Sequence, residues 1–413
     1  MTNFSMAANH SIRPVKEDVI FGMSLKAEEA IKRDGFKNII NSTIGALLDD
    51  EGKLVTFHSV FEVLKGLSDQ QIAAYAPLSG MPEYIKCAIE ATFMDCRPEG
   101  FIDGVATPGG SGAIRHAIWN YTDAGDKILT SNWFWEPYQT MASEHMRKIA
   151  TYELYDENMD FNLKSFETSL SELLSEQKRA LILLNTPAHN PTGYSLSSSE
   201  WLRLREVLVK LSKDENNKIV LFIDVAYLDF CEDEEREFFK ILGGLPKNVL
   251  ILVSFSMSKG YTFYGLRSGA LIGVSSEEKV IKEFKEVCAH SNRGVWSNGT
   301  RAAMETLIEI YRNETVKEKV MAERKIHKEI LKQRAEAFID SASKVGLDLC
   351  PYKGGFFISI PHDDSIKIAE KLVEKNVFVV PLEKGLRFAV CAVSIDKCKT
   401  APLLIKEMMD SLK

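Results

Sequence analysis

Between residues 107 and 273 the chain alternates short apolar runs with longer amphipathic stretches, and this alternation constrains the fold more than any other feature. The runs, rich in leucine and β-branched side chains, cover residues 127–131, 180–184, 218–223, 249–254 and 269–274. Continuous apolar runs of this length are typical of strands that are buried on both faces. We therefore predict a doubly wound α/β domain whose mostly parallel sheet carries helices on both sides.

A second pattern begins near residue 314. Residues 317–343 are long and charged and predict an extended helix, whereas residues 354–360, 377–381 and 386–393 predict strands. Near the N-terminus, residues 15–32 have helical spacing and residues 41–46 predict a short strand. We predict a large domain over residues 56–313, and a smaller α+β domain formed by residues 1–55 together with residues 314–413.

The composition excludes several classes of protein. A net charge of -7 supplies no broad basic field for nucleic acid, and apolar runs such as residues 249–253 are too short to cross a bilayer. Residues 1–19 lack the apolar stretch of a secretory leader, so we expect a cytoplasmic protein. The 7 cysteines are scattered without a C-x-x-C pair and the 8 histidines form no H-E-x-x-H motif, so we expect reduced thiols and no metal.

The apolar run at 249–254 leads into a hydroxyl-rich turn that carries Lys259, and Arg267 comes shortly after. Ligands of parallel sheets bind beyond the carboxyl ends of the strands, where this lysine is expected. A buried lysine shifts its pKa readily and is the usual residue for Schiff-base chemistry. A lone lysine between glycines is nevertheless more often a solvated loop residue, so its interpretation depends on the residues at the ends of the other strands.

Three of those strand ends carry further polar residues. The loop at 107–113 opens a helix with Gly110, Ser111 and Gly112, whose free N–H groups suit an anion, although no clear strand precedes it and a structural glycine turn accounts for it equally well. The run 218–223 ends at Asp224, which suits either a cationic ring nitrogen or a helix cap. The run 180–184 enters a proline-containing turn around Asn190, a residue type common in turns.

Together with Tyr227, these residues match the groups of one cofactor, pyridoxal 5'-phosphate, which carries a phosphate, a ring nitrogen, a phenolic oxygen and an aldehyde. The motifs T-P-G-G at 107–110, N-P-T-G at 190–193, D-V-A-Y at 224–227 and S-M-S-K at 256–259 occur in order. In these motifs the chain resembles the fold-type I pyridoxal-phosphate-dependent aminotransferases of class I/II, with the spacing of aspartate and aromatic aminotransferases. The resemblance extends over nearly the whole chain.

The resemblance implies a role for each motif residue. Lys259 would form the Schiff base with the cofactor and act as acid and base, Asp224 would pair with the ring nitrogen, and Tyr227 would bind the phenolic oxygen together with Asn190. The remaining cofactor-binding residues would be Gly110, Ser111, Gly112, Ser256 and Arg267 at the phosphate, Trp135 on the ring face, and Tyr75 from a neighbouring subunit. The implied assembly is a homodimer with shared active sites.

The resemblance also implies substrate-binding residues. Arg387 would bind the substrate α-carboxylate next to Asn190, and Gly45 would let the backbone approach the substrate. Arg293 aligns by spacing with an arginine that receives a distal carboxylate in the partner's site, the alternative being a surface arginine. Tyr138 and Asn185 stand where the aspartate branch has histidines, which leaves the amino donor open.

These features predict transfer of an amino group between an L-amino acid, either aspartate or glutamate or an aromatic one, and a 2-oxo acid such as 2-oxoglutarate. One alternative is a pyridoxal-phosphate-dependent carbon–sulfur lyase, and another is a non-catalytic regulator built on the same fold. No basic helix-turn-helix segment is evident in the 413 residues, which disfavours the regulator. We expect neither nucleic acid nor membrane as a partner.

Overall fold

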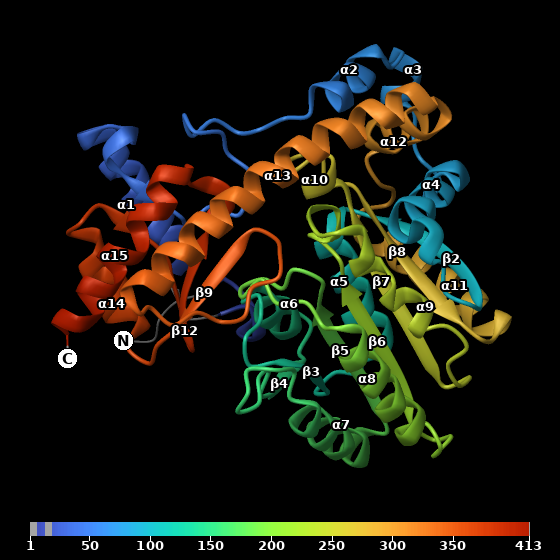
Figure 1. Cartoon of the computed structure of the whole chain (residues 1–413). Coiled ribbons are helices and arrows are strands. Elements are labelled where there is room, and N and C mark those ends of the chain that lie inside the picture. The colour runs from blue at the N-terminus through green and yellow to red at the C-terminus, as the bar shows by residue number, and fades with distance from the viewer. Residues whose placement is uncertain (1–5, 13–18, 413) are drawn as a thin grey trace.

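The computed structural model describes residues 6–12 and 19–412. Its centre is a 7-stranded sheet with the strand order β2-β8-β7-β6-β5-β3-β4 (Figure 1). The strands are β2 (Phe101–Thr107), β3 (Lys127–Ser131), β4 (Lys148–Tyr152), β5 (Arg179–Asn185), β6 (Lys218–Asp224), β7 (Val249–Ser256) and β8 (Gly269–Ser275). Within this sheet β8 runs antiparallel to both of its neighbours and the other pairs are parallel, which confirms the prediction of a mostly parallel sheet.

The two edge strands of the sheet, β2 and β4, were not predicted from the sequence. β2 is partly exposed and contains Asp103 and Gly104, which are residue types depleted in strands, and most of β4 is not buried. β2 leads directly into the glycine loop at the start of α5 (Gly109–Tyr121). A strand does precede the glycine loop, so the expectation that no clear strand precedes it was wrong. The strand was missed because its polar residues interrupt the apolar pattern.

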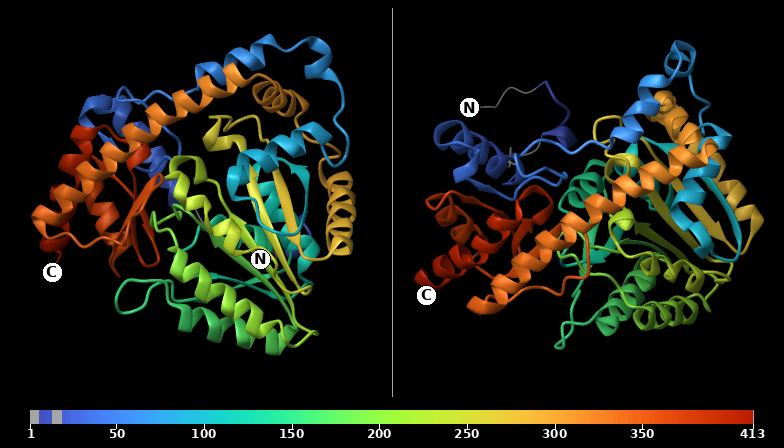
Figure 2. Two further views of the ribbon diagram at one scale, coloured as in Figure 1. Left: turned by 45° about the vertical axis from the view of Figure 1, so that its right-hand side comes forward. Right: turned by 45° about the horizontal axis from the view of Figure 1, so that its top comes forward.

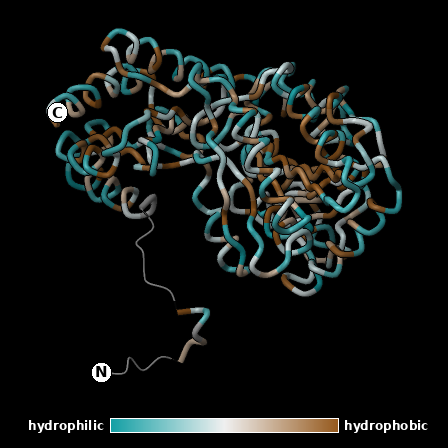
Figure 3. The backbone as a smooth tube through the Cα atoms, turned by 90° about the horizontal axis from the view of Figure 1, so that it is seen from below, coloured by the Kyte–Doolittle hydropathy of each residue, from teal (hydrophilic) through white to brown (hydrophobic). Residues whose placement is uncertain are grey.

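Successive side chains of the sheet enter two separate cores, as a strand's alternation requires. On one face Leu183 packs in a core with α5 and with Phe284 of α11 (Glu278–Val295). On the other face Leu184 belongs to a core that includes α7 (Leu163–Gln177) and Trp201 of α8 (Ser198–Leu211). The helices thus cover both faces, and in Figure 3 the hydrophobic part of the backbone gathers inside this body.

A smaller 3-stranded antiparallel sheet, in the order β11-β12-β9, lies at the other end of the molecule. It consists of β9 (Phe357–Pro361), β11 (Val380–Leu382) and β12 (Gly385–Ala389), next to α1 (Val19–Asp34), α14 (Ser365–Val373) and α15 (Ile395–Ser411). β1 (Ile40–Asn41) pairs with β10 (Val377–Phe378), which joins N-terminal and C-terminal segments. The domain boundaries stay a prediction, and residues 15–18 of the predicted N-terminal helix lie outside the described residues.

The helix α13 (Glu314–Val345) has 32 residues and extends from the large sheet's side to the small sheet, as Figures 1 and 2 show. It confirms the predicted helix at 317–343. The remaining α-helices are α2 (His58–Gly66), α3 (Asp69–Ala73), α4 (Pro82–Phe93), α6 (Pro137–Glu144), α9 (Phe238–Ile241), α10 (Met257–Gly260) and α12 (Arg301–Arg312). None of the helices in the described residues is both long and apolar enough to cross a bilayer.

The part of the chain that the structure describes contains neither a disulfide bond nor a metal-binding cluster. Every cysteine is a free thiol, and each apart from Cys87 is buried. No group of histidine, cysteine, aspartate and glutamate side chains among the described residues is arranged to hold a metal ion. The cysteines therefore pack as small hydrophobic side chains.

Candidate active site

A pocket of about 170 Å³ lies where the carboxyl ends of the parallel strands meet the N-terminus of α5. Because β6 ends at Asp224 and β7 ends at Ser256, these side chains reach the same edge of the sheet. The predicted residues that line the pocket are Gly110, Ser111, Trp135, Asn190, Asp224, Tyr227, Ser256, Lys259 and Arg267. Residues far apart in the sequence are thus brought together as the motifs predicted.

The Asp224 carboxylate is held on several sides. Tyr138 Oη donates a hydrogen bond of 2.9 Å to Asp224 Oδ2, and the Ala226 N–H donates one of 3.2 Å to Oδ1. The Asn185 side chain supports the same strand end, since Nδ2 donates to the Asp224 carbonyl at 2.8 Å. Burial raises the pKa of Asp224, and Tyr138, Lys259 and the Ala226 N–H oppose that rise.

The Lys259 side chain is half-buried, and its partial removal from water lowers the pKa of the amine. The positive charge of Arg267 acts in the same direction, whereas Asp224 opposes the shift. Lys259 Nζ lies 5.6 Å from the centre of the Tyr227 ring. A lysine with a lowered pKa has a larger neutral, nucleophilic fraction, so the site favours covalent chemistry at this amine. The alternative of a solvated loop lysine does not hold.

Asn190 and Tyr227 lie side by side above the strand ends. Asn190 Nδ2 donates to Tyr227 Oη at 3.4 Å, and the Asn190 main-chain N–H donates to Asn185 Oδ1 at 2.6 Å. Burial raises the pKa of Tyr227, so its phenol stays protonated at neutral pH and remains a hydrogen-bond donor. The two side chains together offer donors to an anionic oxygen.

The opposite end of the pocket is rich in donors for an anion. Arg267 Nη1 donates to Ser258 Oγ at 3.2 Å and to the Tyr264 carbonyl at 3.0 Å. Gly109 has a φ of +70°, a backbone conformation that favours glycine, and a Cβ there would lie 2.8 Å from Arg267 Nη2, so glycine leaves room for the guanidinium at the N-terminus of α5. Ser258 also lines the pocket, although the sequence analysis gave it no role.

Gly112 lies inside α5 and is not among the residues that line the pocket. A Cβ there would lie 2.5 Å from Pro108 Cδ, so the glycine allows the helix to begin close behind the proline. Its cofactor role stays a prediction, and the structure gives it a packing role. Of the two neighbouring tryptophans, Trp135 lines the pocket, whereas Trp133 lines a different cavity beside α14.

Arg387 lies on β12 of the small sheet and reaches towards the pocket. Its Nη1 donates to Asn190 Oδ1 at 3.3 Å and its Nη2 donates to the Thr43 carbonyl at 3.1 Å. The guanidinium carbon lies 4.4 Å from the centre of the Phe357 ring, and the buried Nε has no hydrogen-bond partner among the described residues. A Cβ on Gly45 would lie 3.1 Å from Phe357 Cζ, so Phe357, which sequence reasoning missed, shapes this side.

Tyr75 and Arg293 do not join the pocket. The Tyr75 side chain is 87% exposed, and the exposed Arg293 donates from Nη1 to Ser297 Oγ at 2.7 Å on its own helix end. The resemblance assigns both residues to the site of a partner subunit, and the described chain alone leaves that role a prediction.

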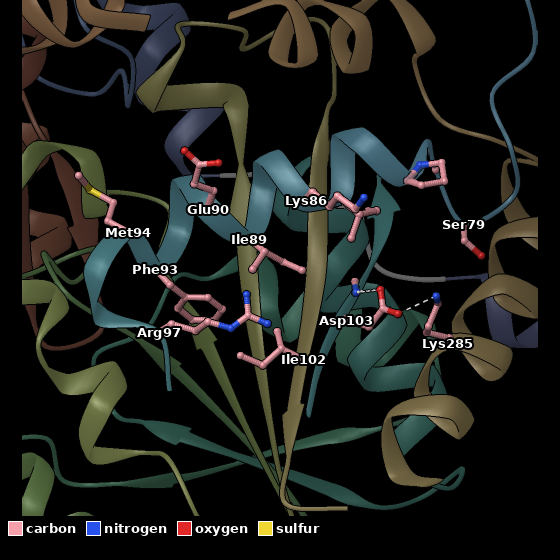
Figure 4. Close-up of a pocket in the computed structure, with 14 residues that line it drawn as sticks. Ser79, Lys86, Ile89, Glu90, Phe93, Met94, Arg97, Ile102, Asp103 and Lys285 are labelled. Carbon is pink, nitrogen blue, oxygen red and sulfur yellow. Dashed lines mark hydrogen bonds and ion pairs between the residues drawn. The ribbon is translucent and has the colours of Figure 1, made fainter. Parts of the chain in front are cut away.

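Another cavity, of about 660 Å³, lies between α4, β2 and α11 (Figure 4). Its floor includes Ile89 and Phe93, and its rim carries an ion pair of 2.7 Å between Lys285 and Asp103. It contains none of the residues that the motifs single out. The smaller pocket around Lys259 is therefore the candidate active site.

A model of the family described as aminotransferase class I and II matches residues 37–401. The chain belongs to this family. A solved aminotransferase from Anaerococcus prevotii has a TM-score of 0.96 and is 38% identical, and the similarity covers 99% of this chain and 100% of that one. The fold prediction is thereby confirmed over almost the full length of the chain.

Two further relatives are more distant from this class I and II aminotransferase. The cytoplasmic aspartate aminotransferase of Dictyostelium discoideum is 26% identical over 303 residues, which cover 71% of this chain and 65% of that relative. The chain thus spans just under two thirds of the length of that curated relative. An aromatic-amino-acid aminotransferase from Burkholderia pseudomallei, solved covalently bound to pyridoxal phosphate, shares the fold with a TM-score of 0.78 at 19% identity, covering 98% of this chain and 100% of that one.

Proposed function

We propose that this member of the family transfers the amino group of an L-amino acid to a 2-oxo acid, with pyridoxal 5'-phosphate bound at Lys259. The observation that carries the proposal is a half-buried Lys259 amine with a lowered pKa, in one pocket with the Asp224 carboxylate and the anion-binding residues around Arg267. Each of these groups has a matching counterpart on the cofactor.

The donor set of the pocket fits that cofactor. The N-terminus of α5, Ser256, Ser258 and Arg267 offer donors for a phosphate, and Arg267 suits it particularly because its fork of N–H groups binds such oxygens bidentately. The carboxylate of Asp224 suits a protonated ring nitrogen at the other end of the pocket. Asn190 and Tyr227 suit the phenolic oxygen, and Trp135 suits the ring face.

When bound, pyridoxal phosphate would supply an electron sink that makes the α-hydrogen of the substrate amino acid more acidic. The residues of this chain then have separate tasks. Lys259 Nζ would take the proton from the substrate α-carbon, since the lowered pKa of this amine enlarges its neutral, basic fraction. Asp224, fixed by Tyr138 Oη, would hold the proton at the ring nitrogen, and Arg387 would bind the α-carboxylate.

The substrate class and the assembly are part of the same proposal. Arg293 is an exposed cation whose guanidinium can meet the distal carboxylate of aspartate, glutamate or 2-oxoglutarate in a partner's site, and Tyr75 is an exposed phenol that does not line the pocket around Lys259 in its own chain. Both observations support a homodimer with shared sites. The name of the cytoplasmic Dictyostelium relative supports a cytoplasmic location.

A screen of amino donors with 2-oxoglutarate tests this function. We expect glutamate formation from aspartate or from an aromatic amino acid, and its loss in Lys259→Ala. Release of pyruvate and ammonia without any 2-oxo acid would instead assign the protein to the lyases. A wild-type protein that takes up no pyridoxal phosphate would contradict the proposal.

A further inference from the structure

The helix that carries Lys259 is too short to fix its own position. α10 has only 4 residues, Met257–Gly260, and Ser256 caps it by accepting a hydrogen bond from the Ser258 N–H at 3.2 Å. Isolated helices need about 12 residues or more to be even marginally stable in water. The orientation of the Lys259 side chain therefore depends on groups that bind this turn from outside.

Arg324, in the middle of α13, binds the end of that turn. Its Nε donates to the Gly260 carbonyl at 2.9 Å, and its Nη1 donates to Asp229 Oδ1 at 3.1 Å. The guanidinium carbon also lies 4.8 Å from the centre of the Tyr261 ring. The planar guanidinium of Arg324 thus contacts Gly260, Tyr261 and Asp229.

Asp229 completes the support from the other side. It pairs with Arg236 Nη2 at 2.8 Å, and Arg236 is only 4% exposed. A Cβ on Gly260 would lie 1.9 Å from Asp229 Oδ2, so the carboxylate packs directly against the backbone of the lysine turn. Gly260 is consequently held between the guanidinium of Arg324 and the carboxylate of Asp229.

We infer that Arg324 is a positioning residue for Lys259, and that the ion-paired group of Arg324, Asp229 and Arg236 sets the orientation of the lysine amine through the Gly260 carbonyl. The inference rests on the proposed function, because it concerns the reacting amine of that site. Reacting groups must be held closely, and a displacement of about 1 Å caused from a distance can cost about 100-fold in rate. None of the three residues lines the pocket around Lys259.

The test uses the holoenzyme with two variants of the arginine. Arg324→Met removes the hydrogen bond to Gly260 but leaves Asp229 paired with Arg236, so the carboxylate keeps a cationic partner. Arg324→Gln keeps one amide donor without the charge. The matched control is Lys328→Met on the same helix, because Lys328 pairs with Glu232 at 2.6 Å and does not contact the lysine turn.

Two readouts separate positioning from a merely structural role: kcat measured apart from KM, and the pH midpoint of the visible absorption of the bound cofactor. We expect Arg324→Met to lower kcat about 10- to 100-fold with little change in KM, and to move the absorption midpoint. Arg324→Gln should show a smaller change in the same direction, and Lys328→Met should behave like the wild type.

Wild-type kcat and an unchanged midpoint in Arg324→Met would overturn the inference, even if its melting temperature fell. If that variant does not fold, the same two readouts on Arg324→Gln decide the question in the same way. A wild-type protein without visible absorption would refute the proposed function instead, so the two failures are distinguishable.

Discussion

Replacement of Arg387 by lysine tests how the site recognises its substrate. The guanidinium is buried and already fixed by Asn190 Oδ1 at 3.3 Å, by the Thr43 carbonyl at 3.1 Å and by the Phe357 ring at 4.4 Å. A lysine ammonium cannot keep those contacts and also meet both oxygens of a carboxylate. Loss of one hydrogen bond to a charged group costs about 1.5 to 3 kcal/mol, which corresponds to about 10- to 150-fold in kcat/KM.

The assay compares an amino acid with the amine that lacks only its carboxylate. In Arg387→Lys, kcat/KM for the amino acid should fall by about 10- to 150-fold, whereas kcat/KM for the amine should stay nearly constant. Arg147→Lys is the control, because Arg147 is a buried arginine bound to Thr122 at 2.8 Å and remote from the pocket. An equal loss for both compounds in Arg387→Lys would refute carboxylate recognition by this residue.

Three further predictions concern the electrostatics and the assembly of the site. Arg293→Leu should raise KM for aspartate or glutamate far more than for an aromatic amino acid, and equal effects in steady-state kinetics would contradict the assignment. Tyr138→Phe removes a hydrogen bond that opposes the rise of the Asp224 pKa, so this pKa should rise further. The acid limb of the pH profile of kcat/KM should then move to higher pH. An unchanged acid limb would exclude an effect of Tyr138 on the Asp224 pKa. Tyr75→Phe should weaken pyridoxal phosphate binding about tenfold. In a mixed dimer of a Tyr75→Phe subunit and a Lys259→Ala subunit, titration with pyridoxal phosphate should show one restored tight site. The absence of that tight site would argue against shared sites.

The strands of the large sheet could be predicted because they are buried on both faces, so that their sequences are nearly continuous apolar runs. The edge strands β2 and β4 could not, because exposed edges tolerate polar residues and leave no such run. The same burial explains why the pocket was predictable. Asp224 and Ser256 are the last residues of strands that the apolar runs predicted. The carboxyl ends of parallel strands lie at the same edge of the sheet, so the two side chains are expected close together.

Other parts of the site depend on contacts that no local pattern encodes. Phe357 and Arg387 come from the small sheet, which contacts the loop after β5: Arg387 Nη1 donates to Asn190 Oδ1 and Ser359 Oγ donates to the Pro191 carbonyl. The support of Gly260 by Arg324 joins residues on separate elements, and neither has a sequence signature. Tyr75 and Arg293 are exposed in the single chain, and the roles proposed for them require a partner subunit.

The most direct test of the central claim is to locate the residue that binds the cofactor. The holoenzyme is reduced with borohydride and digested, and the peptides are analysed by mass spectrometry. We predict a pyridoxyl group on the peptide that contains Lys259, and neither this label nor visible absorption in Lys259→Ala. A label on another lysine, or an unlabelled wild-type protein, would contradict the assignment of Lys259 as the reacting amine.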